Sequence, residues 1–183
     1  MIINILCMSG SLRSASTNTA LLGAAKILAP AEFDVRIWDG LGDLPHFNPD
    51  FEGEAIPKSV IEFRKLAGSC DAIIIACPEY ARGIPGAFKN ALDWLVGSET
   101  FFDRKVALFN ASPRASAAQD ALRLVLTTMA AQIVETACIA VPLISKSMTA
   151  QEIADDQDMS KKINMALTNL SFAIAQRHIE QLD

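Results

Sequence analysis

Short apolar runs alternate with helix-period segments along the whole chain, and this alternation limits the possible folds more than any other feature. It is typical of a parallel sheet that helices cover on both faces. One run, Ala72–Cys77, is continuously apolar, as expected for the centre of a sheet. The five predicted strands are Ile2–Cys7, Phe33–Ile37, Ala72–Cys77, Val106–Asn110 and Ile139–Val141.

Apolar residues recur at helical spacing between the predicted strands. The expected helices are Asn18–Leu28, a segment after Pro57, a segment after Pro85-Gly86, the stripe from Leu122 to Ile133, and Met159–Gln181. The inward faces include Leu21, Ala24, Ala25 and Leu28 in the first helix, Phe88, Ala91, Leu92, Leu95 and Val96 in the third, and Ile163, Leu167, Leu170 and Ile174 in the last. The polar and acidic segment Ser145–Asp158 is predicted to be an exposed loop.

Length and composition indicate one domain over residues 1–183. Of the 183 residues 51% are hydrophobic and 20% charged, which suits a single substantial core. The net charge of −5 and the lack of a basic run argue against a nucleic-acid surface. The amino terminus has no cationic segment, and no apolar run approaches the roughly 20 residues that span a bilayer. We therefore expect a soluble, cytoplasmic protein without nucleic-acid or membrane partners.

The stock of reactive side chains is small. The four cysteines, Cys7, Cys70, Cys77 and Cys138, form no Cys-x-x-Cys pair and lie in apolar segments, so we expect reduced, packed thiols and no metal site. There are only two histidines. Any catalysis should therefore depend on a bound cofactor rather than on a catalytic side chain.

Five strands with a small-residue loop after the first fit a flavodoxin-like α/β fold. This fold is a three-layer sandwich around a five-stranded parallel sheet of order 2-1-3-4-5. Its ligands lie beyond the carboxyl ends of the strands at the switch point, here between strands one and three. Two loops should therefore matter most, Ser9–Asn18 and Pro78–Gly86.

The first loop has the composition of a phosphate cradle. Ser11 and Ser16 can donate hydroxyl hydrogen bonds, Asn18 can donate from its side-chain amide, and Arg13 can donate from a charged guanidinium group. The helix that follows directs backbone N–H groups and the positive end of its dipole toward an anion. The alternative is that Ser16 only caps the helix and Arg13 is a solvated charge.

The second loop is rich in residues that favour irregular turns. Pro78, Tyr80 and Gly83 precede Pro85-Gly86, so backbone N–H and C=O groups here are available to a planar heterocycle, and Tyr80 adds an aromatic wall. The alternative is a tight strand-to-helix connection in which Pro85 starts the helix and Glu79 is solvated.

Together these motifs resemble the NAD(P)H-dependent FMN reductase family, which includes related quinone, azo-dye and chromate reductases. The resemblance rests on four segments. They are Gly10-Ser-Leu-Arg-x-x-Ser-x-Asn18, Leu44-Pro45-x-Phe47-Asn48-x-Asp50, Pro78-Glu-Tyr80 and Pro85-Gly-x-x-Lys-Asn-x-x-Asp-Trp94. Their joint occurrence at this spacing is specific.

The resemblance implies an FMN-dependent oxidoreductase in which the flavin takes hydride from NADPH or NADH. The phosphate of FMN would be held by Ser11, Arg13, Ser16 and Asn18, and the ring by Pro78, Glu79, Tyr80, Ala81, Arg82, Gly83 and Ser112. The electron acceptor would be a small molecule such as a quinone, an azo compound, a flavin or a metal oxyanion. The resemblance also implies a homodimer or homotetramer.

The chain departs from the family pattern in the second loop and after strand four. Ala81 stands where the family usually has Asn, and Arg82 is atypical, either a surface residue or a contact for the reduced flavin or for a nicotinamide dinucleotide phosphate. Ser112-Pro-Arg-Ala-Ser116 lacks the usual Gly-rich turn. Asp93 is expected to pair with Lys89 rather than to act as a base.

Two other functions are compatible with parts of the sequence. Cys7 and Arg13 also satisfy Cys-x5-Arg-Ser, the phosphate loop of low-molecular-weight tyrosine phosphatases, in which the cysteine is the nucleophile. The Asp-Pro motif that supplies the acid in those enzymes is missing from the sequence. A non-enzymatic electron carrier or flavin-binding regulator is the second alternative.

Overall fold

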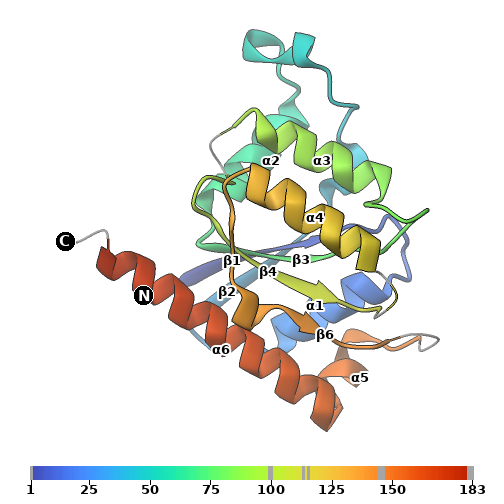
Figure 1. Cartoon of the computed structure of the whole chain (residues 1–183), viewed down its shortest axis with the longest axis vertical. Helices are drawn as coiled ribbons and strands as arrows, with labels where there is room; N and C mark the ends of the chain where they lie inside the picture. The colour runs from blue at the N-terminus through green and yellow to red at the C-terminus, as the bar shows by residue number, and fades with distance from the viewer. Residues whose placement is uncertain (1, 99–100, 113, 115, 144–146, 181–183) are drawn as a thin grey trace.

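A parallel sheet forms the centre of the molecule (Figure 1). The computed structural model describes residues 2–98, 101–112, 114, 116–143 and 147–180. Its strands are β1 (Ile3–Ser9), β2 (Phe33–Trp38), β3 (Ala72–Ala76), β4 (Lys105–Asn110), β5 (Gln132–Ile133) and β6 (Ile139–Ala140). The order is β2-β1-β3-β4-β5 with parallel pairs throughout, which confirms the predicted flavodoxin-like topology.

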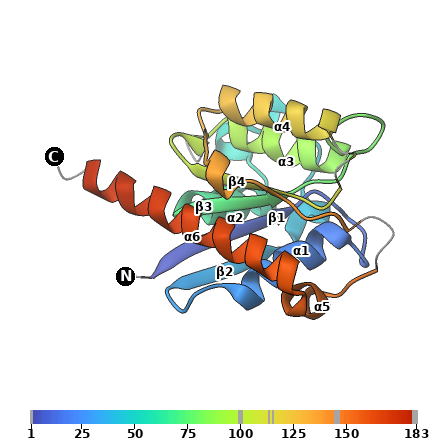
Figure 2. The same cartoon turned by 60° about the horizontal axis from the view of Figure 1, so that its bottom comes forward.

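Helices cover both faces of the sheet. They are α1 (Thr17–Leu28), α2 (Lys58–Ser69), α3 (Gly86–Val96), α4 (Ser116–Thr128), α5 (Ala150–Asp155) and α6 (Gln157–Glu180). In Figure 1, α2, α3 and α4 lie above the sheet, and α1, α5 and α6 lie below it; Figure 2 shows the same two layers from another direction. None of the helices in the described part of the chain is long and apolar enough to cross a membrane.

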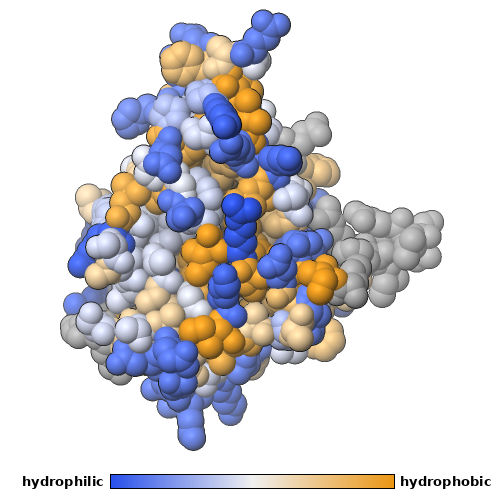
Figure 3. Space-filling model, turned by 180° about the vertical axis from the view of Figure 1, so that it is seen from behind, coloured by the Kyte–Doolittle hydropathy of each residue, from blue (hydrophilic) through white to orange (hydrophobic). Residues whose placement is uncertain are grey.

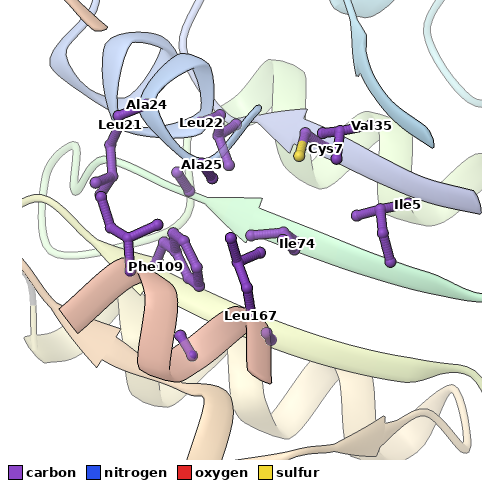
Figure 4. Packing of buried hydrophobic residues seen from close by; sticks show 14 of the residues in the cluster. Ile5, Cys7, Leu21, Leu22, Ala24, Ala25, Val35, Ile74, Phe109 and Leu167 are labelled. Atoms are coloured by element: carbon purple, nitrogen blue, oxygen red, sulfur yellow. The ribbon is translucent and has the colours of Figure 1, made fainter. Parts of the chain in front are cut away.

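Alternate residues of β1 supply the two halves of the core, because successive side chains of a strand point to opposite faces. Ile5 and Cys7 pack in the cluster with α1 and α6, as the close view in Figure 4 shows. Leu6 and Met8 pack in the other cluster, with the buried faces of α2, α3 and α4. The outer surface seen from behind carries separate apolar patches with hydrophilic side chains between them (Figure 3).

The fifth position of the sheet differs from the prediction. The expected strand Ile139–Val141 corresponds to β6, which pairs with the carboxyl-terminal end of β4. The amino-terminal end of β4 pairs instead with β5. The expected helical stripe from Leu122 to Ile133 is wrong at its end, since α4 stops at Thr128. Ala130 has φ of 57°, the Ala131 N–H donates to the Leu126 carbonyl and the Ala130 N–H to the Thr127 carbonyl. These bonds form a Schellman motif, whose left-handed residue is usually Gly.

The predicted loop over Ser145–Asp158 is also wrong in its described part, residues 147–158, because this part contains α5; Ser145 and Lys146 lie outside the described residues. Thr149 and Glu152 form a capping box at the start of this helix, and Ile153 is fully buried. The Thr-x-x-Glu spacing is a known signal for the start of a helix. The polar composition of the segment had favoured a loop instead. A smaller error concerns Val96, which was expected on the inner face of α3 and is 61% exposed.

The long connection from β2 to α2 is held against α3. Its three short 3-10 helices are η1 (Gly40–Asp43), η2 (Pro49–Phe51) and η3 (Gly53–Ala55). The Asn90 side chain accepts from the Phe47 N–H (2.7 Å) and donates to the Pro45 carbonyl (3.0 Å), and the Trp94 indole N–H donates to the same carbonyl (2.8 Å). The Phe47 ring meets the Trp94 ring edge-on. Two of the motifs behind the family resemblance therefore bind each other.

Candidate functional site

The loops after β1 and β3 meet at the carboxyl edge of the sheet. The Gly10 N–H donates to the Ala76 carbonyl (2.9 Å), which continues the pairing of β1 with β3 by one residue. A Cβ on Gly10 would lie 2.9 Å from Cys77 Sγ and 3.2 Å from Pro78 Cδ. Only glycine allows this approach, so residue 10 keeps the two predicted site loops side by side.

The first loop combines a helix cap with free donor groups. Ser16 is the N-cap of α1, and its Oγ accepts from the Thr19 N–H (3.3 Å). The Ser11 Oγ accepts from the Arg13 N–H (3.3 Å). As acceptors in these bonds, both hydroxyls keep their own O–H for an anion. Ser16 therefore caps α1, and this role leaves its O–H available, so the predicted phosphate contact of Ser16 stays a prediction.

Burial separates the members of this loop. Ser16 and Asn18 are buried, Ser11 is half-buried and Arg13 is exposed. Sequence reasoning missed Thr19, whose hydroxyl donates to the buried Ser9 Oγ (2.8 Å) and so braces α1 against the end of β1. The run of hydroxyl residues from position 9 to 19 is the pattern that pointed to it.

The second loop forms a two-residue turn over Tyr80–Gly83. The Tyr80 N–H donates to the Gly83 carbonyl (3.1 Å), and the Gly83 N–H donates to the Tyr80 carbonyl (3.0 Å). Between them Ala81 and Arg82 have φ of 49° and 63°, which defines a type I′ turn. A left-handed backbone costs an L-residue other than Gly, Asn or Asp about 1–2 kcal/mol. The turn therefore stores strain at two successive residues.

Glu79 links this turn to the helix after β4. Its Oε2 accepts from the Ala118 N–H in the first turn of α4 (3.0 Å). The alternative is thus confirmed in that Pro85 is the N-cap of α3, and wrong in that the Glu79 carboxylate is bonded to α4 rather than solvated. Ser112, which follows β4, is half-buried, and its N–H donates to the Asn110 side chain (2.9 Å). The Glu79 side chain thus joins the second loop to α4, in addition to the pairing of β3 with β4.

Two cavities open between these elements and share Leu12 and Arg13. One, of about 370 Å³, lies between the first and second loops and is mainly apolar. Its lining residues are Gly10, Leu12, Arg13, Tyr80, Pro85, Gly86 and Ala87. The other, of about 290 Å³, is rich in hydroxyls. It is lined by Ser9, Ser11, Leu12, Arg13, Ser14, Thr19, Ile37, Trp38, Asp39 and Leu41. Sequence reasoning missed Leu12 and Gly86, because neither carries a polar group.

Cys7 is not a nucleophile in this fold. Its side chain is completely buried on the face of the sheet toward α1, among Val35, Ile74 and Leu22 (Figure 4). Burial raises the pKa of the Cys7 thiol to about 12. A phosphatase needs an accessible thiolate inside the loop, so the phosphatase alternative is wrong.

The other reactive groups are also structural. All four cysteines are free, and burial raises the pKa of the Cys77 thiol beside the site to about 12. The Asp93 carboxylate pairs with the Lys89 ammonium at 2.5 Å, as predicted. Among the described residues no group of three or more His, Cys, Asp or Glu side chains is arranged to hold a metal ion.

The fold and the site define a class of protein, a flavodoxin-like α/β protein with a loop suited to a phosphate group at the switch point of its sheet. The model of the NADPH-dependent FMN reductase family matches residues 3–145, and the chain belongs to this family. This confirms the resemblance recognised in the sequence motifs.

Individual relatives agree with this membership. A quinone reductase of Pseudomonas putida is 38% identical over 100 residues, 55% of this chain and 52% of that protein. An NAD(P)H-dependent FMN reductase of Pseudomonas aeruginosa is 38% identical over 92 residues, 50% of this chain and 49% of that protein. The matched region thus spans about half the length of these relatives.

A solved structure shares the fold over nearly the whole chain. The flavoenzyme NAD(P)H:(acceptor) oxidoreductase from Paracoccus denitrificans superposes with a TM-score of 0.75 at 23% sequence identity, covering 96% of this chain and 98% of that one.

Proposed function

We propose that this protein binds FMN and passes electrons from NADPH or NADH to a small quinone-type acceptor. The observation that carries the proposal is that two different loops line one apolar cavity. The Ser9–Asn18 loop contributes hydroxyl groups and Arg13, and the Tyr80–Gly83 turn contributes an aromatic ring. FMN is a phosphate joined to a planar ring through a flexible chain, and it needs both kinds of surface. Quinone reductases among the relatives support the choice of acceptor.

The donor set fits FMN. Ser11, Ser16 and Asn18, with the N-terminus of α1, would hold the phosphate, and Arg13 would neutralise part of its charge. A Cβ on Gly86 would meet nothing within 4 Å, so the wall of the cavity at the start of α3 has open space beside it for a ring. When bound, FMN supplies the ring that accepts hydride from the nicotinamide.

The chain's own residues act by placement. Leu12, Tyr80 and Pro85 would exclude water from one side of the ring. The N–H groups of Tyr80 and Gly83 close the turn, so the N–H groups of Ala81 and Arg82 at its tip are the candidate donors to the reduced ring. The contacts of Pro78, Glu79, Gly83 and Ser112 with the ring remain predictions. No side chain is required as a catalytic acid or base.

The decisive test is to titrate the purified protein with FMN and then add NADPH without oxygen. A flavin spectrum that bleaches supports the reductase. A bound flavin that stays oxidised with both NADPH and NADH would favour an electron carrier or regulator, and failure to bind FMN would refute the proposal.

Arg13→Ala tests the phosphate cradle. Loss of a charge-assisted hydrogen bond costs about 1.5–3 kcal/mol, so FMN should bind roughly 10- to 100-fold more weakly. Arg36→Ala is the matched control, because Arg36 is also exposed but lies on β2, outside the two site cavities. Equal affinities of both variants would remove Arg13 from the site.

We further propose a cytoplasmic homodimer or homotetramer. Three large apolar side chains are each at least 61% exposed: Val96 at the end of α3, Phe102 before β4, and Leu124 on α4. Exposed apolar side chains of this size favour association between subunits. The four free cysteines fit a reducing compartment. Light scattering during gel filtration would give the subunit number, and a monomer mass at micromolar concentration would contradict the association.

A further inference from the structure

The Tyr80–Gly83 turn has a sequence that does not favour its own backbone. Residues Ala81 and Arg82 occupy the two left-handed positions, where Asn and Gly are preferred. Tyr80 is 49% exposed, and Ala81 and Arg82 are also exposed, so side-chain burial contributes little to holding the turn. The conformation therefore depends on the residues that flank the turn.

Glu79 provides a link from the turn to a rigid part of the molecule. Its carboxylate accepts a hydrogen bond from the N–H of Ala118, the third residue of α4. The N–H groups in the first turn of a helix have no acceptor within the helix, so Glu79 supplies one. A carboxylate is also favoured at this end of a helix by the dipole. Ala118, Leu122 and Leu126 are fully buried, so α4 is fixed in the core. One side chain thus connects the core with the residue just before the turn.

We propose that Glu79 is a positioning residue, which holds the Tyr80–Gly83 turn in its left-handed conformation from α4. Its carboxylate, which is bonded to α4, acts on the cofactor through the backbone of the turn. The inference rests on the proposed function, because the turn matters only if it faces FMN. A residue that merely capped α4 would affect the free energy of unfolding without affecting the turn.

The first experiment uses the protein without FMN. Hydrogen exchange at the Tyr80 and Gly83 amides reports opening of the turn, since both N–H groups are bonded within it. In Glu79→Ala we expect these two amides to exchange about tenfold faster or more. Glu79→Gln keeps an acceptor oxygen and should lie between the wild type and Glu79→Ala. It also replaces Glu79→Ala if that variant fails to fold.

Glu152→Ala is the matched control for helix capping. The Glu152 carboxylate accepts from the Thr149 N–H (2.7 Å) at the start of α5, a similar contact at another helix. This variant should lower the unfolding temperature while leaving exchange at Tyr80 and Gly83 unchanged. The comparison separates loss of a cap from loss of the turn.

The second experiment measures FMN affinity by quenching of flavin fluorescence. Glu79→Ala should raise the Kd about tenfold, or 1.4 kcal/mol. Adding Ala81→Gly should restore the affinity, because glycine adopts positive φ without a steric penalty. The unfolding temperature of the double variant should stay low, because α4 still lacks its acceptor.

Two results would overturn the proposal. One is wild-type exchange at Tyr80 and Gly83 in Glu79→Ala; the other is a loss of FMN affinity that Ala81→Gly does not reverse. If the wild-type protein failed to bind FMN, the proposed function would fall, while the exchange measurements would still decide the role of Glu79 in the turn.

Discussion

Adding one methyl group at Gly10 should separate the two loops of the site. The new Cβ would lie 2.9 Å from Cys77 Sγ, 3.2 Å from Cys77 Cα and 3.2 Å from Pro78 Cδ. The last two atoms belong to backbone and to a proline ring and cannot rotate away, so the loops after β1 and β3 must move apart. Overpacking of this kind costs about 1–3 kcal/mol. Each kcal/mol lowers Tm by about 2–4 °C in a domain of this size, so Gly10→Ala should lower it by about 2–12 °C.

Thermal unfolding followed by circular dichroism, together with an FMN titration, measures both consequences. Gly86→Ala is the matched control for the unfolding measurement alone, because Gly86 lines the cavity proposed for the flavin ring: a Cβ there meets nothing within 4 Å, and alanine is the better helix former at the start of α3. Its Tm should be unchanged or higher. Combining Gly10→Ala with Cys77→Ala removes the nearest atom and should recover only part of the FMN affinity. A Gly10→Ala variant with wild-type Tm and FMN affinity would refute the argument.

Three further predictions concern the support of the site. Asn90→Ala removes the two hydrogen bonds that the Asn90 side chain makes to the Pro45–Phe47 segment, while that of the Trp94 indole stays, and should cost about 1–3 kcal/mol in urea unfolding; an unchanged midpoint would show that the segment is held otherwise. Cys7 should resist alkylation at pH 8 until the protein unfolds, because burial raises the pKa of its thiol, and Cys7→Ser should retain flavin reduction; rapid native labelling would contradict its placement. The hydrogen bond from Arg64 lowers the pKa of Glu52, so this pair stabilises the fold above the ordinary carboxyl pKa and the stabilisation is lost as pH falls through the lowered value. Glu52→Gln should thus be less stable than the wild type near neutral pH and equally stable in acid, and a constant difference across this range would exclude the ion pair as the cause.

The central strands and the first three helices could be predicted because their patterns are long and regular. Ala72–Cys77 is apolar throughout, and β3 occupies all of it but the last residue. The failures occur where a structural element is short or ends without its usual residue. β5 has only two residues, too few to show alternation, and α4 ends at Thr128 and is followed by Ala130 in a conformation that normally requires glycine.

The place of the Ser9–Asn18 loop could likewise be predicted from sequence, because a loop after a strand of a parallel sheet lies at the carboxyl edge of that sheet. The bond from Glu79 to Ala118 could not, since it joins residues 39 positions apart. The left-handed turn was equally hidden, because neither Ala81 nor Arg82 favours it.

The sequence by itself therefore determined the order of the strands, the layers of helices and the edge of the sheet where the two loops of the candidate site lie. Apolar periodicity and loop composition depend only on residues that are close in the sequence, so they can be recognised without knowing the fold. Only the tertiary structure decided that Cys7 points toward α1 rather than into the loop, that Gly10 must lack a side chain and that Glu79 reaches α4. These facts depend on which atoms from distant segments come within a few ångströms of one another, and no local pattern records that distance.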